Sequence, residues 1–136
     1  MSTICTDKTG TLTEGLLRVG HVEPVAGLEA TDVLRLAALA SRAETGDPLD
    51  IAILDAAGAQ ARTPQVVATF PFTEDRKRET VIVSAAGGVL AVTLAVTKGA
   101  PETIVALCDA GGGDLLNWRE RVEALARTGH KVIAIA

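Results

Sequence analysis

The chain has 136 residues, of which 48% are hydrophobic, and it contains two Phe, one Trp and no Tyr. This length fits one domain with a usable core, and because aromatic residues are so few, Ala, Val, Leu and Ile must do the packing. The formal net charge of −4 argues against a nucleic-acid-binding protein, which would need a basic surface.

The first half of the chain is predicted to hold one strand and two helices. Residues 16–25 alternate loosely between apolar and polar positions, which predicts a strand. Thr31 is the expected N-cap of a first helix, whose apolar residues fall on one face. Asp47 is the expected N-cap of a second helix that begins at Pro48.

The second half of the chain is dominated by β-branched, alternating segments. They predict strands over residues 66–70, 80–84 and 89–97, and residues 85–88 form a hairpin signal between the last two. A helix over residues 101–107, a break at 111–113, a helix over 115–127 with Gly129 as its C′ residue, and a strand over 131–136 complete the chain. The expected fold is therefore α+β, an antiparallel sheet flanked by helices. Because the sequence stops on an apolar strand without a polar tail, we expect it to be cut from a longer polypeptide.

A first group of candidate catalytic residues lies near the N-terminus. Asp7 stands where a short apolar run meets a polar turn, and backbone N–H groups in such a turn suit a phosphoryl group. Lys8 and the hydroxyls of Thr9 and Thr11 add donors for phosphate oxygens. An aspartate in this setting can attack a γ-phosphate to give an aspartyl-phosphate. The spacing alone fits an ordinary polar turn equally well.

A second group of candidates lies at the end of the predicted strand 89–97. Gly99 and Ala100 let a flat ligand approach the backbone closely, and Lys98 places a cation beside it. An ordinary strand–turn–helix connection explains these residues as well. Upstream, residues 70–78 hold two phenylalanines followed by a basic turn, and an aromatic ring next to cations suits stacking on a base, which contributes roughly 1–3 kcal/mol. The alternative there is a core aromatic residue next to a solvated run of charges.

Two strings in the sequence are similar to signatures of P-type (E1-E2) cation-transporting ATPases. These are Asp7-Lys8-Thr9-Gly10-Thr11-Leu12-Thr13 and Lys98-Gly99-Ala100-Pro101-Glu102, and they occur in the order found in that family. The resemblance implies that Asp7 is phosphorylated and that Thr9 supplies a Mg²⁺ ligand through its carbonyl, so that both belong to an incomplete Mg²⁺ site. It also implies that residues 1–14 begin a haloacid-dehalogenase-like phosphorylation domain and that residues 15–136 form a nucleotide-binding domain.

The same resemblance implies a set of ATP contacts. Phe72 would stack on the base, Lys77 would lie on the phosphate side, and Asp50 would face the adenine amino group. The expected ATP-binding residues are Asp50, Phe72, Lys77, Lys98, Gly99, Ala100 and Lys131. Asp47 is open to two interpretations, as a helix cap or as an adenine contact. Phe70 is expected in the core, and Cys5 and Cys108 are expected as buried thiols of a reducing compartment.

The function implied by the resemblance is ATP-driven cation transport. The chain would be the ATP-binding domain, on the cytoplasmic side of an integral membrane protein, and would deliver the γ-phosphate to Asp7. The remaining phosphorylation, actuator and transmembrane domains would be its partners, and the transported cation would bind elsewhere. The isolated chain is expected to bind ATP without turnover. Two alternatives remain: a small haloacid-dehalogenase-type phosphatase, although Thr9 replaces the usual acid/base aspartate, and a non-catalytic nucleotide-sensing module.

Overall fold

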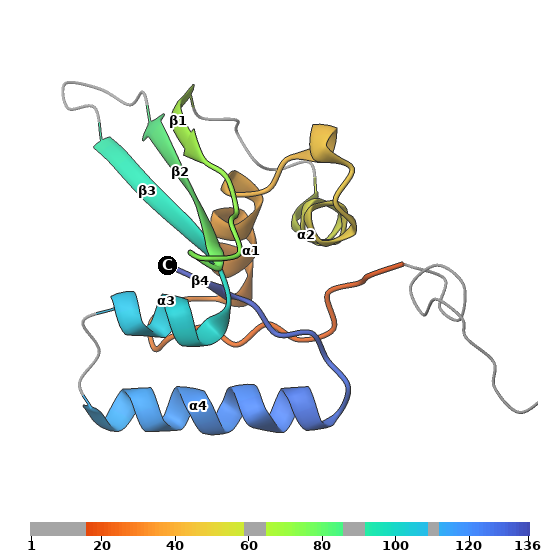
Figure 1. Cartoon of the computed structure of the whole chain (residues 1–136), viewed down its shortest axis with the longest axis vertical. Coiled ribbons are helices and arrows are strands. Elements are labelled where there is room, and N and C mark those ends of the chain that lie inside the picture. The colour runs from red at the N-terminus through yellow and green to blue at the C-terminus, as the bar shows by residue number, and fades with distance from the viewer. Residues whose placement is uncertain (1–15, 59–64, 86–91, 109–111) are drawn as a thin grey trace, which may run out of the picture.

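The computed structural model describes residues 16–58, 65–85, 92–108 and 112–136. Its elements in chain order are α1 (Ala30–Leu39), the 3-10 helix η1 (Ala43–Thr45), α2 (Pro48–Ala57), β1 (Gln65–Phe70), β2 (Arg78–Ala85), β3 (Val92–Gly99), α3 (Pro101–Leu107), α4 (Gly112–Arg127) and β4 (Ala134–Ile135). The strands form one antiparallel sheet in the order β1-β2-β3-β4, and the helices lie around it (Figure 1). The predicted α+β fold is confirmed.

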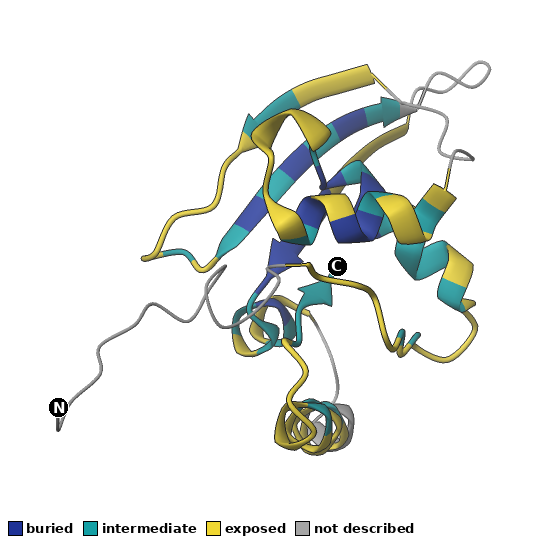
Figure 2. Cartoon of the chain, turned by 90° about the vertical axis from the view of Figure 1, so that its right-hand side faces the viewer, coloured by how far each residue is buried: buried dark blue, intermediate teal, exposed yellow. Residues whose placement is uncertain are grey.

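The core lies between the sheet and α1, and α2 packs against α1. Ala40 of the α1 C-cap is fully buried against Val81, Val83 and Val96 of β2 and β3, and Leu36, Leu39 and Ile135 pack around this cluster. Figure 2 shows buried residues gathered where the strands and the helices face each other. The alanines of α1 let the helix approach the sheet closely, so the predicted aliphatic packing is confirmed.

The central hairpin sets the position of the candidate residues. β2 and β3 pair without interruption from Arg78 opposite Gly99 to Ala85 opposite Val92. In the same register Glu79 stands directly opposite Lys98, and β4 joins the other side of β3 with Ile135 opposite Lys98. Both Glu79 and Lys98 are buried, which brings two charged side chains to the inner face at this end of the sheet.

The helix ends confirm two predictions and correct one. Asp47 caps α2, since its Oδ1 accepts from the Leu49 N–H at 2.8 Å. Gly129 follows α4 with φ of 87°, the left-handed conformation expected of a C′ glycine. The prediction that Thr31 caps α1 is wrong, because the N-cap is Glu29, whose N–H donates to Asp32 Oδ2 at 3.1 Å.

Two predicted strands are corrected by the pairing. Residues 16–25 carry no strand or helix assignment, and among the described residues no strand pairs with them. The predicted strand 131–136 is reduced to Ala134–Ile135. The alternating pattern predicts an extended chain, but a strand also needs a hydrogen-bonding neighbour. The predicted break at 111–113 is wrong as well for Gly112 and Gly113, which belong to α4.

Two burial predictions are also wrong. Phe70 is 47% exposed, because β1 is the edge strand of the sheet and Phe70 is its last residue. Cys108 is an exposed free thiol just after α3, and Cys5 lies outside the described residues. Within the part of the chain that the structure describes, no helix has the length and apolar character needed to cross a membrane.

Candidate functional site

A buried cluster of charges lies beside the helices at the edge of the sheet where β2 begins and β3 ends. The Lys98 ammonium donates hydrogen bonds to Asp50 Oδ1 and to Ser41 Oγ, the latter at 3.0 Å. It also forms an ion pair with Glu79 Oε1 at 2.7 Å. The exposed fractions are 3% for Lys98, 4% for Asp50 and 8% for Glu79. An ammonium has three N–H groups, and three oxygens contact it here.

The burial of these charges is tolerable only because they are paired. Transfer of an isolated ion from water to a protein interior costs several kcal/mol, even after relaxation of the surroundings. Lys98 carries one positive charge between the two negative charges of Asp50 and Glu79, and Arg42 supplies a second positive charge at 3.7 Å from Glu79 Oε2. The cluster is therefore neutral as a whole. A substitution that removes one charged side chain of this cluster therefore leaves an opposite charge buried without its ion-pair partner.

Asp50 is held firmly by the turn that precedes it. It lies in the first turn of α2, and its Oδ2 accepts from the Arg42 backbone N–H at 3.1 Å and from Thr45 Oγ1 at 3.4 Å. The cap at Asp47 fixes the start of the helix. Local backbone chemistry thus positions the predicted adenine partner, and Asp47 acts as the helix cap in this structure.

Gly99 allows the end of β3 to pass close to the start of β2. A Cβ atom at Gly99 would meet the Lys77 carbonyl oxygen and would lie 2.8 Å from Arg78 Cα, so a side chain does not fit there. The Ala100 N–H donates to the same Lys77 carbonyl at 3.0 Å. Lys77 itself has a φ of 50°, which is uncommon for a residue other than glycine. The structure therefore brings Lys77, Gly99 and Ala100 together.

The outer rim of this region is formed by the loop between β1 and β2. Phe72 is 53% exposed, and Lys77 forms an exposed ion pair with Glu102 of α3 at 3.8 Å. Thr73 closes the loop, since its carbonyl accepts from the Lys77 N–H at 2.8 Å. An exposed pair of this kind contributes at most about 1 kcal/mol. The ring of Phe72 and the ammonium of Lys77 are therefore available to a ligand.

The remaining predicted residues fall outside this cluster. Lys131 is exposed in the segment between α4 and β4, where it borders a separate cavity that is described below. No hydrogen bond or ion pair joins Lys131 to the other candidates within the described residues. Asp7, Lys8, Thr9 and Thr11 lie outside the described residues, so their catalytic and Mg²⁺-binding roles stay predictions.

Sequence reasoning missed Glu79, Ser41 and Arg42. Glu79 shares the inward face of β2 with the buried Val81 and Val83, an alternation that is visible in the sequence. Its meaning depends on the register, because only the pairing of β2 with β3 places Glu79 opposite Lys98. Ser41 and Arg42 follow α1 and carry no motif.

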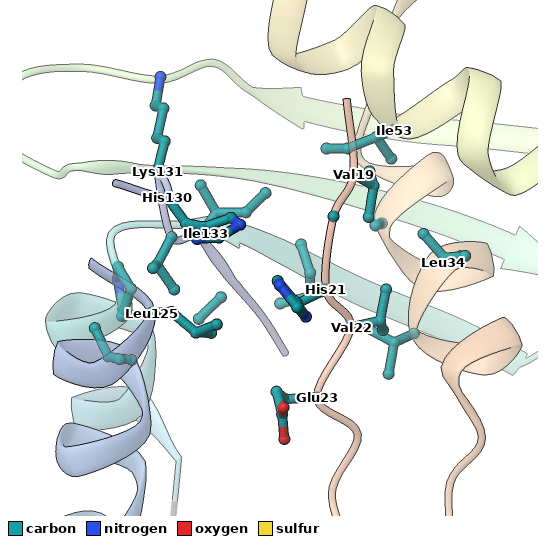
Figure 3. Close-up of a pocket in the computed structure, with 18 of the residues that line it drawn as sticks. Val19, His21, Val22, Glu23, Leu34, Ile53, Leu125, His130, Lys131 and Ile133 are labelled. Atoms are coloured by element: carbon teal, nitrogen blue, oxygen red, sulfur yellow. The ribbon is translucent and has the colours of Figure 1, made fainter. Parts of the chain in front are cut away.

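A separate cavity of about 530 Å³ lies between residues 16–25, α4 and the segment leading to β4 (Figure 3). Its walls are mainly aliphatic, and the rings of His21 and His130 meet edge to face with centroids 4.8 Å apart. Of the seven predicted ATP-binding residues, only Lys131 lines it. Among the described residues no group of three or more His, Cys, Asp or Glu side chains is placed to hold a metal ion.

Comparisons with known proteins agree with this architecture. Residues 29–136 match the family described as "P-type ATPase, cytoplasmic domain N". The chain is 33% identical over 138 residues to a Methanocaldococcus jannaschii protein whose name describes a cation-transporting ATPase, with 98% of this chain and 16% of that protein covered. It is 31% identical over 153 residues to the "Magnesium-transporting ATPase, P-type 1" of Salmonella typhimurium, with 100% and 17% covered. It is 34% identical over 163 residues to a cation-transporting ATPase I of Mycobacterium tuberculosis, with 100% and 10% covered.

The chain thus spans only about a sixth of the length of the Methanocaldococcus jannaschii and Salmonella typhimurium relatives, 16% and 17% respectively. The family match covers most of the chain, including α1, the hairpin and β4. The chain belongs to the cation-transporting P-type ATPase family, as its cytoplasmic domain N.

Proposed function

We propose that this domain binds ATP at the open end of the β2–β3 hairpin, where Arg78 stands opposite Gly99. Within a P-type cation-transporting ATPase it would present the γ-phosphate to Asp7. The observation that carries the proposal is the layered arrangement at this end of the sheet. A buried Lys98–Asp50 pair forms the floor, and Phe72 and Lys77 stand exposed on the adjoining loop. Gly99 keeps the backbone between them free of side-chain bulk.

Each layer matches one part of the nucleotide. An exposed aromatic ring suits stacking on adenine, which contributes roughly 1–3 kcal/mol, and a mobile ammonium such as that of Lys77 suits phosphate oxygens. The carboxylate of Asp50 and the ammonium of Lys98 offer an acceptor and a donor side by side. This pattern complements an adenine edge, which presents an amino donor beside a ring-nitrogen acceptor. Lys131 would approach the phosphates from the segment before β4.

The chemistry would then follow the phosphoryl-transfer pattern. Transfer of a γ-phosphoryl group depends mainly on positioning and on neutralisation of charge. A carboxylate oxygen of Asp7 would attack the γ-phosphorus, and the bond to the β-phosphate oxygen would break with ADP as the leaving group. Lys8 and Thr11 would donate to phosphate oxygens, and Mg²⁺ would be held by Asp7 and Thr9. The aspartyl-phosphate would drive cation movement through transmembrane and actuator parts of the parent protein, with this domain on the cytoplasmic side.

The test is an ATP titration of the 136-residue chain followed by NMR, with ADP, AMP and GTP as comparisons. We expect weak binding with a Kd of about 0.1–1 mM, equivalent to about 4–5.5 kcal/mol, and shifts centred on Phe72 and on residues 98–100. Phe72→Ala should weaken binding by about 5- to 150-fold, the equivalent of a stacking energy of roughly 1–3 kcal/mol.

Phe70→Ala is the matched control, because Phe70 is an exposed phenylalanine of the same segment, 47% exposed against 53% for Phe72. It should leave the Kd within about twofold of the parent chain. Equal losses in the two variants, or no shift at several millimolar ATP, would contradict the proposed site.

A further inference from the structure

We propose that Glu79 is the exchangeable partner of Lys98, and that it moves from Lys98 to Arg42 when a nucleotide base occupies the site. This inference rests on the proposed function and adds a positioning residue to it. Without ligand, the ammonium of Lys98 faces three oxygens, on Ser41, Asp50 and Glu79. Because an ammonium has three N–H groups, a base can accept a hydrogen bond from Lys98 only if one of these oxygens withdraws.

The three oxygens differ in how firmly the rest of the protein holds them. Ser41 Oγ also donates to the Ala37 carbonyl at 2.9 Å, and Asp50 Oδ2 accepts from the Arg42 backbone N–H at 3.1 Å. Glu79 makes no second hydrogen bond within the described residues. Its other oxygen lies 3.7 Å from Arg42 Nη2, which is too far for a hydrogen bond. Glu79 is therefore the partner that can leave with the smallest loss.

Arg42 is prepared to receive this carboxylate. Its Nε is a buried nitrogen without a hydrogen-bond partner among the described residues, which is unusual because buried donors are nearly always satisfied. The guanidinium group presents Nε and Nη in a planar fork that matches a carboxylate. Movement of Glu79 by about 1 Å, the difference between 3.7 Å and a normal hydrogen bond, would bring it within reach of this fork.

The exchange conserves hydrogen bonding and charge. Before it, Glu79 satisfies Lys98 and Arg42 Nε is unpaired. After it, a ring nitrogen of the base accepts from Lys98, and Glu79 accepts from Arg42. No proton changes its residue, and both carboxylates stay paired with a cation. A base that presents an N–H donor at this position, as guanine does at N1, cannot replace Glu79 on the ammonium, so the exchange favours adenine.

The first measurement is the NMR signal of the Arg42 Nε–Hε group in the unmodified chain during ATP titration. We expect it to move downfield at saturation, because it gains a carboxylate acceptor. The Nε–Hε signal of Arg35 is the internal control, since Arg35 is exposed on α1, with 69% of its side chain accessible, and should not move. AMP should give the same shift as ATP, and GTP should not.

The second measurement is the nucleotide affinity of three variants. Glu79→Gln should bind ATP about 3- to 10-fold more tightly, because a neutral amide competes less for the ammonium than a carboxylate does. Arg42→Lys, which removes the fork, should bind about 3- to 10-fold more weakly. The double variant Glu79→Gln/Arg42→Lys should bind ATP as tightly as Glu79→Gln alone. Arg42 acts on the site only by receiving the Glu79 carboxylate, so the effects of the two substitutions are not additive.

The outcomes separate this inference from the proposed function. Shifts at Phe72 without any change at Arg42 Nε–Hε, together with unchanged affinity of Glu79→Gln, would overturn the exchange and leave the ATP site standing. The absence of ATP-induced shifts at Phe72 would overturn both. If Glu79→Gln does not fold, the Arg42 signal of the unmodified chain still decides the question.

Discussion

The buried Lys98 ammonium should be one of the main supports of the domain. In Lys98→Met the side-chain length is nearly kept, but Asp50 and Glu79 lose the cation that lies between them. Both carboxylates are at least nine-tenths buried, with exposed fractions of 4% and 8%. Breaking a buried pair on one side destabilises a protein by about 3–5 kcal/mol. Because Arg42 stays 3.7 Å from Glu79, we expect a loss near 3 kcal/mol.

The loss is measured by urea unfolding of the purified chain, followed by circular dichroism and by the fluorescence of the single tryptophan. Lys77→Met is the matched control, because Lys77 is a lysine at the same end of the hairpin whose side chain is 58% exposed. It should cost no more than about 1 kcal/mol. Adding Glu79→Gln to Lys98→Met should recover part of the loss, since one uncompensated charge disappears. The reasoning is refuted if the two lysine variants unfold at the same urea concentration.

Three further changes test local features of the site. Gly99→Ala should destabilise the domain by about 1–3 kcal/mol, because its methyl group would lie 2.8 Å from Arg78 Cα; an unchanged urea midpoint would contradict this. Lys77→Gly should raise the free energy of unfolding by about 0.5–1 kcal/mol, because glycine adopts the positive φ of 50° without strain. The same variant should bind ATP more weakly. If Lys77→Gly unfolds at a lower urea concentration than Lys77→Ala, the backbone at this position is not strained. Asp47→Ala should lower stability by about 1 kcal/mol through loss of the 2.8 Å bond to the Leu49 N–H, whereas Asp47→Asn should retain most of it.

Local sequence patterns determined much of this fold. The predicted helix starting at Pro48 and the helix over residues 101–107 are found at α2 and α3, because proline and capping chemistry act within one turn of the chain. The strands of the central hairpin were visible because alternation of β-branched residues is also a local signal. The two family signatures were readable for the same reason, since each is a short continuous string.

The tertiary structure decided what the local patterns leave open. Residues 16–25 and 131–136 have the alternation of strands. Within the described residues, however, only the last three of them, residues 134–136, hydrogen-bond to a strand, β3, because a ladder requires a neighbour from elsewhere in the chain. Glu79 became part of the site only through its register opposite Lys98. Asp50 and Lys98 are 48 residues apart in the sequence, and no local signal links them. Their ion pair forms because the packing of the N-terminal helices on the sheet removes both charges from water, so that each is stable only beside the other.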